Sequence, residues 1–325
     1  MPAYHIAFYA DSGPPIPAFA RAVRGAYNAL AEANAGRIFI LPVQRKPGCF
    51  VFDFEAQEPM VTQMHAAVIQ CLCEADSLFP TASIALSLRG PPLYPSPEFG
   101  NVLERFRADA APVALEMLEA VCQRSARSFP LSANILLRYS RMIAPLEIGY
   151  FFMRTYFEKA LAFTQGDVEA NRQRFERAYA KLREESDVWV TRALAGKTPV
   201  PAHCDAVDSW FAQLTQLRQA LEVLHRDGTK IKWSGDDIGA LRGQRAGGVP
   251  ERSGFVRTIG ANHRLWQQMD EGGVQQVHAA LATELHQLLG LLRLDHRARM
   301  LIFYALARSI ETKCGIDPLR RAAEV

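Results

Sequence analysis

The stretch CFVFDFEA (residues 49–56) decides the fold of the first part of the chain. Its rings Phe50, Phe52 and Phe54 fall on every second position. Because successive side chains of a β-strand point to opposite faces of a sheet, this alternation predicts a strand with three aromatic rings on one face. Three further strands are predicted over YHIAFYA (4–10), GRIFILPV (36–43) and SIALSLRG (83–90).

Two helices are predicted between these strands. Residues 17–34 carry apolar side chains every three or four positions, which is the period of an amphipathic helix. Residues 58–75 do the same with Met60, Met64 and Val68. The resulting order, strand–helix–strand–strand–helix–strand, is that of a ferredoxin-like domain, in which two helices cover one face of an antiparallel sheet. We therefore expect an α+β protein, although such a fold names no function.

The proline-rich segment PPLYPSPEFG (91–100) interrupts the periodic pattern and predicts a boundary between domains. We expect a ferredoxin-like domain over residues 1–92 and a mostly helical domain over residues 97–325. Within the latter, residues 228–262 contain eight glycines, and six basic residues against three acidic ones. Loops of this length are usually either functional lids or linkers, and the sequence leaves both interpretations open.

Composition argues against several classes of function. The net charge of +3 over 325 residues is too small to favour nucleic-acid binding. No apolar run reaches the length of a membrane span, and the N-terminus lacks the pattern of a signal peptide. The six cysteines are scattered, which favours free thiols in a cytoplasmic protein over a metal site. We expect no metal and no cofactor.

The spacing of residues along the sequence indicates few candidate catalytic or binding groups. His286 and Arg293 are seven positions apart, and on a continuous helix they would lie about 20° apart on one face. There they would supply a proton acceptor and an anion clamp. The ordinary alternative is a half-buried histidine and an arginine that points to solvent. Arg154 and Glu158 have the spacing of a surface ion pair on a helix.

Two other basic groups stand out. Arg138 and Arg141 lie close together in one predicted helix. The segment RARMLIFYALARSIETKCGID (297–317) is apolar but begins with Arg297 and Arg299. These charges are either the satisfied polar anchors of a core helix or part of a binding site for a carboxylate or a peptide.

Three stretches of the chain together resemble a known family. They are the opening YHIAFYADSGPPIPAFARAVRGAYNAL…GRIFILPVQRKPGCFVFDF, the helix YFFMRTYFEKALAF (150–163) and the closing LHQLLGLLRLDHRARMLIFYALARSIETKCG (285–315). In order and pattern they are similar to the thiopeptide-type bacteriocin biosynthesis domain family. That family includes the C-terminal glutamate-elimination domain of class I lanthipeptide dehydratases and the pyridine synthases of thiopeptide pathways.

Individual residues match the family in the second and third stretches. The corresponding helix of pyridine synthases typically reads Phe-Arg-Ser-His-Ala-Glu-Ala-Phe-Leu. Arg154 and Glu158 match it, and Tyr156 stands where that helix has His. Arg299 and Glu311 match the closing helices of the family.

The chain departs from the family between the second and third strands. The family usually carries arginines around a Gly-Pro-His-Leu-Arg-Leu turn, whereas Pro42, Cys49 and Val51 occupy the Arg, His and Arg positions here. Arg45 and Lys46 remain near the turn. Because the family arginines are natural partners of a glutamyl carboxylate, their loss argues against glutamate elimination. It affects peptide binding or cyclisation less.

The resemblance implies modification of a ribosomally made precursor peptide. The implied reaction is a pyridine-synthase-like formal aza-[4+2] cyclisation, or a related elimination on dehydroamino acids. Arg154, Tyr156, His286 and Tyr304 are the catalytic candidates. The candidates for substrate binding are Arg45, Lys46, Arg138, Arg141, Arg242, Arg245 and Arg293. Residues 228–262 are expected to act as a lid or peptide clamp over a cleft between the two domains.

The alternative is a non-catalytic partner protein that binds a leader peptide or a companion enzyme and presents the substrate. A third interpretation is a ferredoxin-like plus helical protein unrelated to peptide modification. The candidate partners are the precursor peptide with its leader and core, companion modification enzymes and a second copy of the chain in a homodimer. Nucleic acid and membrane are not expected as partners.

Overall fold

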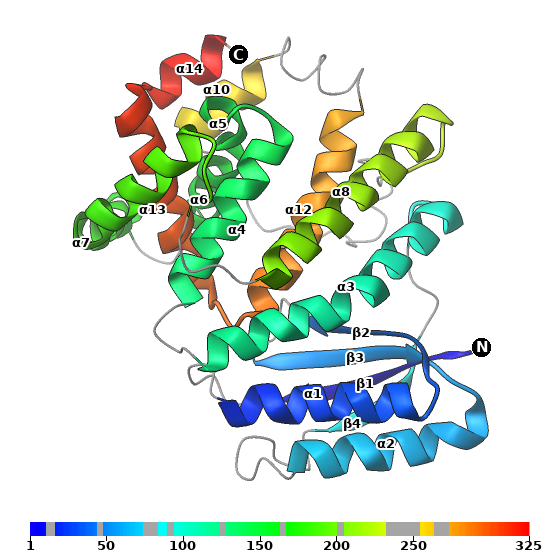
Figure 1. Cartoon of the computed structure of the whole chain (residues 1–325). Helices are drawn as coiled ribbons and strands as arrows, with labels where there is room; N and C mark the ends of the chain where they lie inside the picture. Colours follow the sequence, from blue (N-terminus) through cyan, green and yellow to red (C-terminus); the bar gives the residue numbers. More distant parts are fainter. Residues whose placement is uncertain are drawn as a thin grey trace. The chain divides into compact units, whose positions relative to one another are not determined.

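The structure is a computed structural model of the chain (Figure 1). It describes residues 1–10, 17–43, 48–73, 84–89, 94–123, 128–162, 167–199, 205–231, 254–262 and 273–324. Contacts divide the chain into two compact units. The first comprises Met1–Ser128, Cys204–Asp236 and Ala279–Leu294, and the second comprises Phe129–His203, Asp237–His278 and Asp295–Val325. The sequence predicted a boundary between residues 92 and 97 that separates two independently folding domains. Units defined by contacts do not test independent folding, so this boundary stays a prediction.

The first unit is built around an antiparallel sheet. Its strands are β1 (Ala3–Tyr9), β2 (Gly36–Pro42), β3 (Cys49–Glu55) and β4 (Ala85–Leu88), in the spatial order β2-β3-β1-β4. Its helices are α1 (Pro17–Glu32), α2 (Glu58–Cys73), α3 (Pro97–Gln123) and α8 (Asp205–Arg226), with the greater part of α12 (Val274–Leu291). The prediction of an α+β protein with a small antiparallel sheet and a helical region is confirmed.

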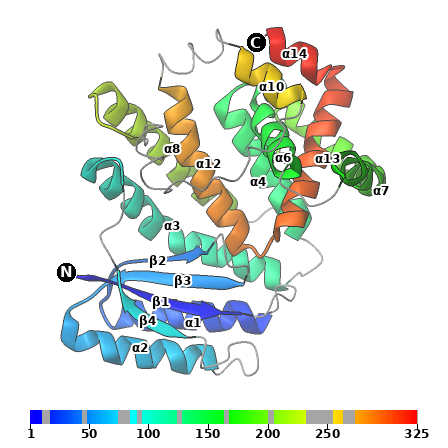
Figure 2. The ribbon, with the colours of Figure 1, turned by 180° about the vertical axis from the view of Figure 1, so that it is seen from behind.

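Helices α1 and α2 cover one face of the sheet (Figure 2), and aromatic rings fill that face. In the pairing of β1 with β3, Ile6 lies opposite Phe52 and Phe8 lies opposite Phe50, so the period-2 pattern of both strands points to this face. The ring centroids of Phe8 and Phe52 are 5.4 Å apart, and Phe19 of α1 packs on Phe50 at 5.5 Å. These buried rings form the apolar core that holds the two helices on the sheet.

Buried charges lie on the opposite face of the sheet, beside α3. Asp53 of β3 accepts a hydrogen bond from Arg89 at 2.9 Å, and its other oxygen lies 3.0 Å from Nε2 of His5. Arg89 also donates to Glu104 of α3 at 2.7 Å. Both carboxylates are buried, and each has a cationic partner, as a charge removed from water requires.

Helix α12 approaches the sheet through two specific contacts. Arg107 of α3 donates to both oxygens of Glu284 of α12, at 2.7 and 3.0 Å. At Gly290, an added Cβ would lie 2.7 Å from Cγ of Pro42 in β2. A side chain at this position would therefore overlap the proline ring, so the absence of a Cβ permits the close packing of α12 on β2.

The second unit is helical. It contains α4 (Ser128–Ile143), α5 (Leu146–Gly149), α6 (Phe151–Ala162), α7 (Val168–Leu194), α10 (Gly254–Ala261), α13 (His296–Cys314), α14 (Pro318–Glu324) and the first residues of α12. Helix α13 packs against α6 and α7. Asp295 caps its N-terminus by accepting a hydrogen bond from the backbone N–H of Ala298 at 2.6 Å, and Gly315 ends it with a φ of 62°.

The predicted loop over residues 228–262 is wrong at its C-terminal end. Gly254–Ala261 forms helix α10. The reason is packing, because Phe255 is buried and its ring centroid lies 5.7 Å from that of Phe151. Residues 232–253 lie outside the described residues, so their role as a lid stays a prediction. Among the described residues, no helix is long and apolar enough to cross a membrane.

Candidate functional site

Arg154 of α6 lies at the centre of a buried ion-pair network in the second unit. Its Nη2 is 3.0 Å from Glu158, and its Nη1 is 3.4 Å from Glu311 of α13. Arg172 of α7 donates to both oxygens of Glu158 at 2.8 Å. The aromatic ring of Phe255 lies 5.7 Å from the Arg154 guanidinium carbon. The network therefore ties α6, α7 and α13 together.

The predicted surface ion pair of Arg154 and Glu158 is wrong in its setting. Glu158 is only 2% exposed and Glu311 only 3%. Burial raises the pKa of Glu311, whereas the charges of Arg154 and Arg308 lower it. Because the two carboxylates are removed from water, the Arg154 charge is needed inside the protein. This favours a structural role for Arg154, and its catalytic role stays a prediction.

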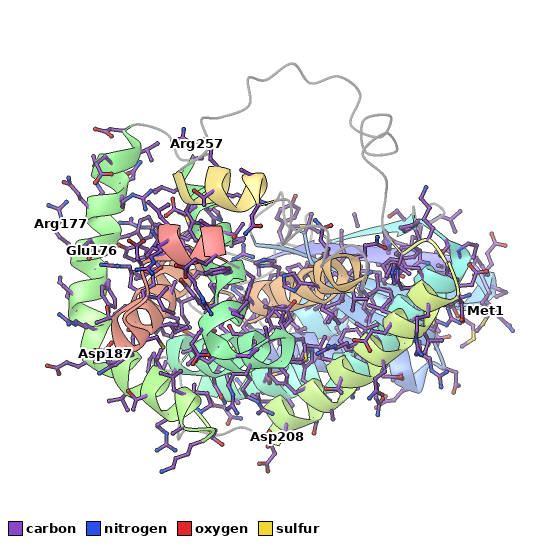
Figure 3. The ribbon with its side chains drawn as sticks, turned by 90° about the horizontal axis from the view of Figure 1, so that it is seen from above. Met1, Glu176, Arg177, Asp187, Asp208 and Arg257 are labelled. Carbon is purple, nitrogen blue, oxygen red and sulfur yellow. The ribbon has the colours of Figure 1, made fainter. Side chains whose placement is uncertain are left out.

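Tyr304 of α13 is engaged near the same network. Its hydroxyl donates a hydrogen bond to Glu176 of α7, which Figure 3 labels. Arg308 lies 3.5 Å from the other oxygen of that carboxylate and 3.0 Å from Glu311. Burial raises the pKa of Tyr304, so the phenol stays protonated. Its proton is directed to a protein carboxylate, and a catalytic role for Tyr304 stays a prediction.

A second polar group lies between α6 and the first turn of α13. It consists of Tyr156, His296 and Arg299, which we call the Tyr156 cluster. The ring centroids of Tyr156 and His296 are 6.4 Å apart, and Tyr156 packs edge-on against Phe303 at 4.5 Å. His296 and Arg299 have i,i+3 spacing and therefore neighbour each other on the surface of α13. The Asp295 cap fixes the turn from which both project.

The surroundings shift the titration of two members of the Tyr156 cluster. Burial raises the pKa of Tyr156, and the charge of Arg299 acts in the opposite direction. Burial lowers the pKa of His296, and repulsion by Arg299 lowers it further, while Asp295 raises it. At neutral pH the phenol is therefore protonated and the imidazole is mainly neutral. Among the described residues, Nε of Arg299 is buried without a hydrogen-bond partner.

The Tyr156 cluster thus combines a hydrogen-bond donor, a neutral imidazole that accepts a proton and a fixed cation. Proton transfer at an amide or a carbonyl uses these three kinds of group, because charge develops on the oxygen while a proton leaves nitrogen or carbon. The part of the chain that the structure describes contains no group of three or more His, Cys, Asp and Glu side chains placed to hold a metal ion.

Aromatic rings connect the Tyr156 cluster to a phenol–imidazole pair, in which Tyr139 is buried and His278 is half-buried. The hydroxyl of Tyr139 in α4 is 2.9 Å from Nδ1 of His278. Burial lowers the pKa of His278 to about 4, so its ring is neutral at pH 7. The ring of Phe152 packs edge-on against Tyr139 at 4.9 Å and against Phe303 at 5.9 Å. A continuous row of aromatic side chains therefore supports Phe303 and, through it, Tyr156.

The predicted pairing of His286 with Arg293 is wrong. Helix α12 ends at Leu291, and Arg293 follows it with a φ of 61°, so the two residues do not share a continuous helix. The guanidinium of Arg293 instead lies 4.6 Å from the ring centroid of Phe19 in α1, a cation–π contact that fixes the turn. His286 is half-buried and belongs to the first unit. Its catalytic role stays a prediction.

The remaining predicted residues are less informative. Arg45, Lys46, Arg242 and Arg245 lie outside the described residues. Arg138 is half-buried in α4, and Arg141 is exposed in the last turn of that helix. Their role in substrate binding stays a prediction.

Sequence reasoning missed His296. It named Arg299 as one of the charges at the start of the 297–317 segment and as a match to the family. The one local signal was a histidine followed three residues later by an arginine at the start of an apolar helix. Such a signal is common, and it becomes informative only when Tyr156, on another helix, is found beside it.

Comparison with solved structures places the fold among known proteins. The chain is similar to TsrL over 99% of its own length and 98% of that chain, with a TM-score of 0.68 and 16% sequence identity. A second similar structure is a pyridine synthase. TbtD, the pyridine synthase from thiomuracin biosynthesis, matches over 98% of this chain and 100% of its own, with a TM-score of 0.64 and 17% identity.

A third similar structure is larger. The tRNA-dependent lantibiotic dehydratase MibB from Microbispora sp. 107891 matches over 99% of this chain but 28% of its own length, with a TM-score of 0.52 and 11% identity. No known sequence family matches the chain. No curated protein sequence matches it either. At such low identities these likenesses show a shared fold, and they assign no activity to this chain.

Proposed function

We propose that this protein modifies a ribosomally made precursor peptide by joining two dehydroamino acids in a formal aza-[4+2] cyclisation of the pyridine-synthase type. The observation that carries the proposal is the likeness in fold to TsrL and TbtD, which extends over nearly all of each chain. The presence of Pro42, Cys49 and Val51 in place of the family's Arg and His residues supports cyclisation over glutamate elimination.

The residues of the Tyr156 cluster suit the proton transfers of this reaction. Two new C–C bonds close the ring, one between the two β-carbons and one from the amide carbon to the α-carbon of the second dehydroamino acid, and water and the leader peptide then leave. The reactive form of the first amide is its iminol tautomer, in which the N–H proton has moved to oxygen. We assign to Tyr156 a hydrogen bond to the amide oxygen and to neutral His296 the N–H proton. Arg299 would stabilise negative charge as it develops on that oxygen.

Proximity supplies the rest of the rate. When the protein holds two dehydroalanines at reacting distance, the entropy cost of bringing them together is already met on binding. This contribution to lowering the barrier is larger than that of any further activation. The ring of Tyr156 is half-buried and packs on the fully buried Phe303, so its exposed part offers an apolar surface against which a planar dehydroamino acid would pack. We also infer that the first unit has ferredoxin-like topology, because its strand order is β2-β3-β1-β4.

Mass spectrometry tests the proposal. The purified protein is incubated with the dehydrated precursor peptide encoded beside its gene, and peptide binding is titrated in the same mixture. The proposal expects binding together with the loss of water and leader. A loss of glutamate from a glutamylated peptide would instead indicate elimination, and an unchanged mass in spite of binding would overturn the catalytic proposal.

A non-catalytic peptide-binding partner is the second candidate function. The observation that favours it is the internal pairing of two predicted catalytic residues, Arg154 with Glu158 and Glu311, and Tyr304 with Glu176. A protein that only presents a peptide needs no free acid or base. Binding of the dehydrated peptide without any mass change would support this function.

A further inference from the structure

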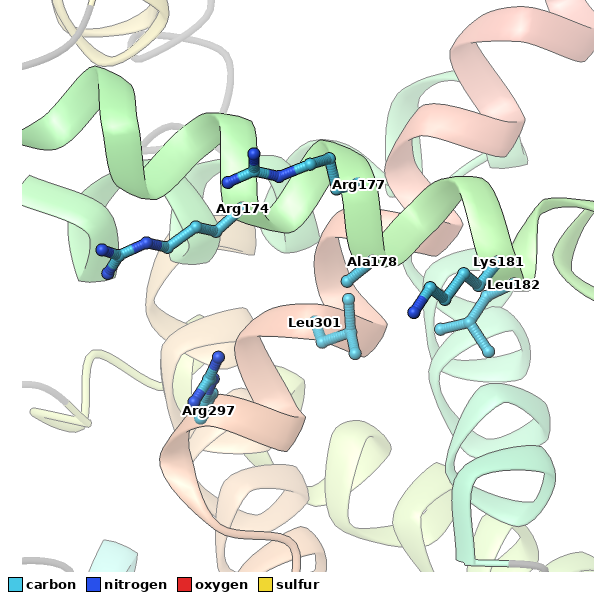
Figure 4. A pocket seen from close by; sticks show the side chains of 7 residues that line it. All are labelled: Arg174, Arg177, Ala178, Lys181, Leu182, Arg297 and Leu301. Carbon is cyan, nitrogen blue, oxygen red and sulfur yellow. The ribbon is translucent and has the colours of Figure 1, made fainter.

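A basic pocket lies between α7 and α13 of the second unit (Figure 4). Arg174, Arg177 and Lys181 line it from α7, and Arg297 lines it from the first turn of α13. The three α7 residues are spaced three and four positions apart, so they lie along one face of the helix over roughly 10 Å. In Figure 4 the side chain of Arg297 points toward α7. We call these four side chains the basic pocket residues.

The floor of the pocket is aliphatic. Ala178 and Leu182 of α7 meet Leu301 of α13 between the charged side chains (Figure 4). The pocket is open to solvent and has a volume of ≈ 590 Å³. Its size and form are suited to a few residues of a peptide that combine charge with an apolar side chain.

The charge of this pocket is not neutralised by the described residues around it. Arg177, Lys181 and Arg297 have no carboxylate at ion-pair distance in the part of the chain that the structure describes, and Arg174 donates to the amide oxygen of Asn171 at 3.2 Å. The contrast with the nearby Arg172 is informative, because that guanidinium is paired with Glu158. Four cations around one concave surface repel one another, and an anionic ligand would relieve that repulsion.

The position of Arg297 strengthens this argument. The carboxylate of Asp295 caps the N-terminus of α13, and the first turn of the helix adds no further acidic residue. The positive end of a helix dipole disfavours a cation such as Arg297. A bound carboxylate would be attracted by both the guanidinium and the helix N-terminus.

We propose that the basic pocket binds an acidic segment of the peptide substrate. This inference rests on the proposed function, since it names the part of the peptide that the protein holds. The ligand would carry two or three carboxylates within about three extended residues or two helical turns, which matches the span of the α7 cations. A leucine-sized side chain between them would pack on Leu182 and Leu301.

A peptide fits this surface better than RNA does. The residues that line the described pocket include no aromatic ring, whereas single-stranded nucleic acid is usually held by stacking on aromatic side chains. The net charge of the chain is only +3, so an extended basic surface is not expected. The aliphatic floor offers an apolar peptide side chain a contact that a phosphate backbone cannot use.

Fluorescence anisotropy tests the inference with defined probes. The probe is a labelled synthetic peptide, Gly-Ser-Glu-Leu-Asp-Glu-Leu-Ser-Gly, and its neutral analogue carries Gln and Asn in place of Glu and Asp. We expect the acidic probe to bind at least about tenfold more tightly than the analogue at low salt, with the difference shrinking as salt is added.

Matched variants locate the binding. The double variant Arg177→Glu/Lys181→Glu reverses two basic pocket residues. The control Arg21→Glu/Arg105→Glu makes the same change in net charge on two exposed arginines of α1 and α3 in the first unit. We expect the pocket variant to lose at least about tenfold in affinity for the acidic probe and the control to stay within about twofold of the wild type. The single variant Arg297→Glu should weaken binding in the same direction, and circular dichroism checks that each variant is folded.

Several results would overturn the inference. Equal losses in the pocket variant and the control would show a general charge effect. Equal affinity for the acidic probe and its neutral analogue would show that the carboxylates are not recognised. Tighter binding of a single-stranded RNA of equal charge, lost in the pocket variant, would assign the pocket to nucleic acid.

The two proposals fail separately. If the precursor peptide is cyclised equally well by the Arg177→Glu/Lys181→Glu variant and the acidic probe does not bind, the pocket assignment is wrong and the proposed function stands. If the acidic probe binds through the pocket and no dehydrated peptide changes mass, the pocket assignment stands and the catalytic proposal is wrong.

Discussion

Arg154 of α6 and Glu311 of α13 form an ion pair, with 3.4 Å between Nη1 and Oε1, in the interior of the helical unit. The two residues are far apart in the sequence, and Glu158 completes the pairing from one turn along α6. This relationship makes the position of α13 against α6 depend on charge as well as on apolar packing. The first turn of α13 carries His296 and Arg299 beside Tyr156 of α6, so the network also fixes the Tyr156 cluster.

Removal of the Arg154 charge should destabilise the protein strongly. In an Arg154→Met variant, Glu158 keeps Arg172, but the buried Glu311 loses one of its two cationic partners. We expect the free energy of unfolding to fall by roughly 3–5 kcal/mol, as when one partner of a buried pair is removed. Urea denaturation followed by circular dichroism measures the change.

A second substitution distinguishes this cause from lost packing. Glu311→Gln in the Arg154→Met background removes the uncompensated charge and should restore part of the lost stability. Lys159→Met, at an exposed position of the same helix, should change the free energy of unfolding by no more than about 0.5 kcal/mol. A loss in Arg154→Met as small as that of the Lys159 control would contradict the structural role of the network.

The neutral state of His278 predicts a dependence of stability on pH. Its pKa in the folded protein is lowered to about 4, against about 6.5 in an unfolded chain. Between these values the unfolded state binds more protons, so stability is fully present above pH 6.5 and declines as the pH falls toward 4. We expect His278 to account for about 2 kcal/mol of the loss between pH 7.5 and pH 5.

The variant Tyr139→Phe/His278→Leu provides the comparison for this prediction. It removes both members of the hydrogen-bonded pair and therefore leaves no buried polar group unpaired. Other groups titrate alike in the two proteins, so the difference in their unfolding free energies, measured by urea denaturation at both pH values, isolates His278. Parallel pH profiles for wild type and variant would refute a neutral His278.

Two glycine substitutions test the packing of the first unit. Gly290→Ala should destabilise the protein by about 1–3 kcal/mol, because its Cβ would overlap the ring of Pro42. Gly25→Ala, in the interior of α1, meets its nearest neighbour Cys71 at an ordinary 3.6 Å. Alanine should stabilise that helix by roughly 0.5–1 kcal/mol. Thermal melts of both variants give the signs, and a stabilising Gly290→Ala would be inconsistent with the contact between α12 and β2.

Local sequence patterns predicted much of the fold and little of the site. The rings of Phe50, Phe52 and Phe54 share a face because the two-residue period of a strand is a local property. The apolar periods of α1 and α2 have the same character. The end of α12 is different. Arg293 lies beyond the last residue of the helix and contacts Phe19 of α1, and no local sequence pattern predicts that contact.

The Tyr156 cluster shows the limit most clearly. Tyr156 was selected because it occupies a position of the family's helix, whereas nothing along the sequence connects His296 to Tyr156. Their meeting depends on the packing of α13 against α6, which spacing within one helix does not encode. The same limit explains why Arg154 and Glu158 suggested a surface pair, since burial of the network requires Glu311 and Arg172 from two other helices.

The most direct test of the central claim is the rate at which Tyr156→Phe converts the dehydrated precursor peptide, measured by intact mass beside the wild type and a Tyr9→Phe control. The control changes a phenol at an exposed position of the first unit. If the Tyr156 cluster performs the proton transfers, the wild type and the control lose water and leader at similar rates. Tyr156→Phe should then be at least about 100-fold slower while it binds the peptide with unchanged affinity. Conversion by Tyr156→Phe at the wild-type rate, or no conversion by the wild type, would contradict the account.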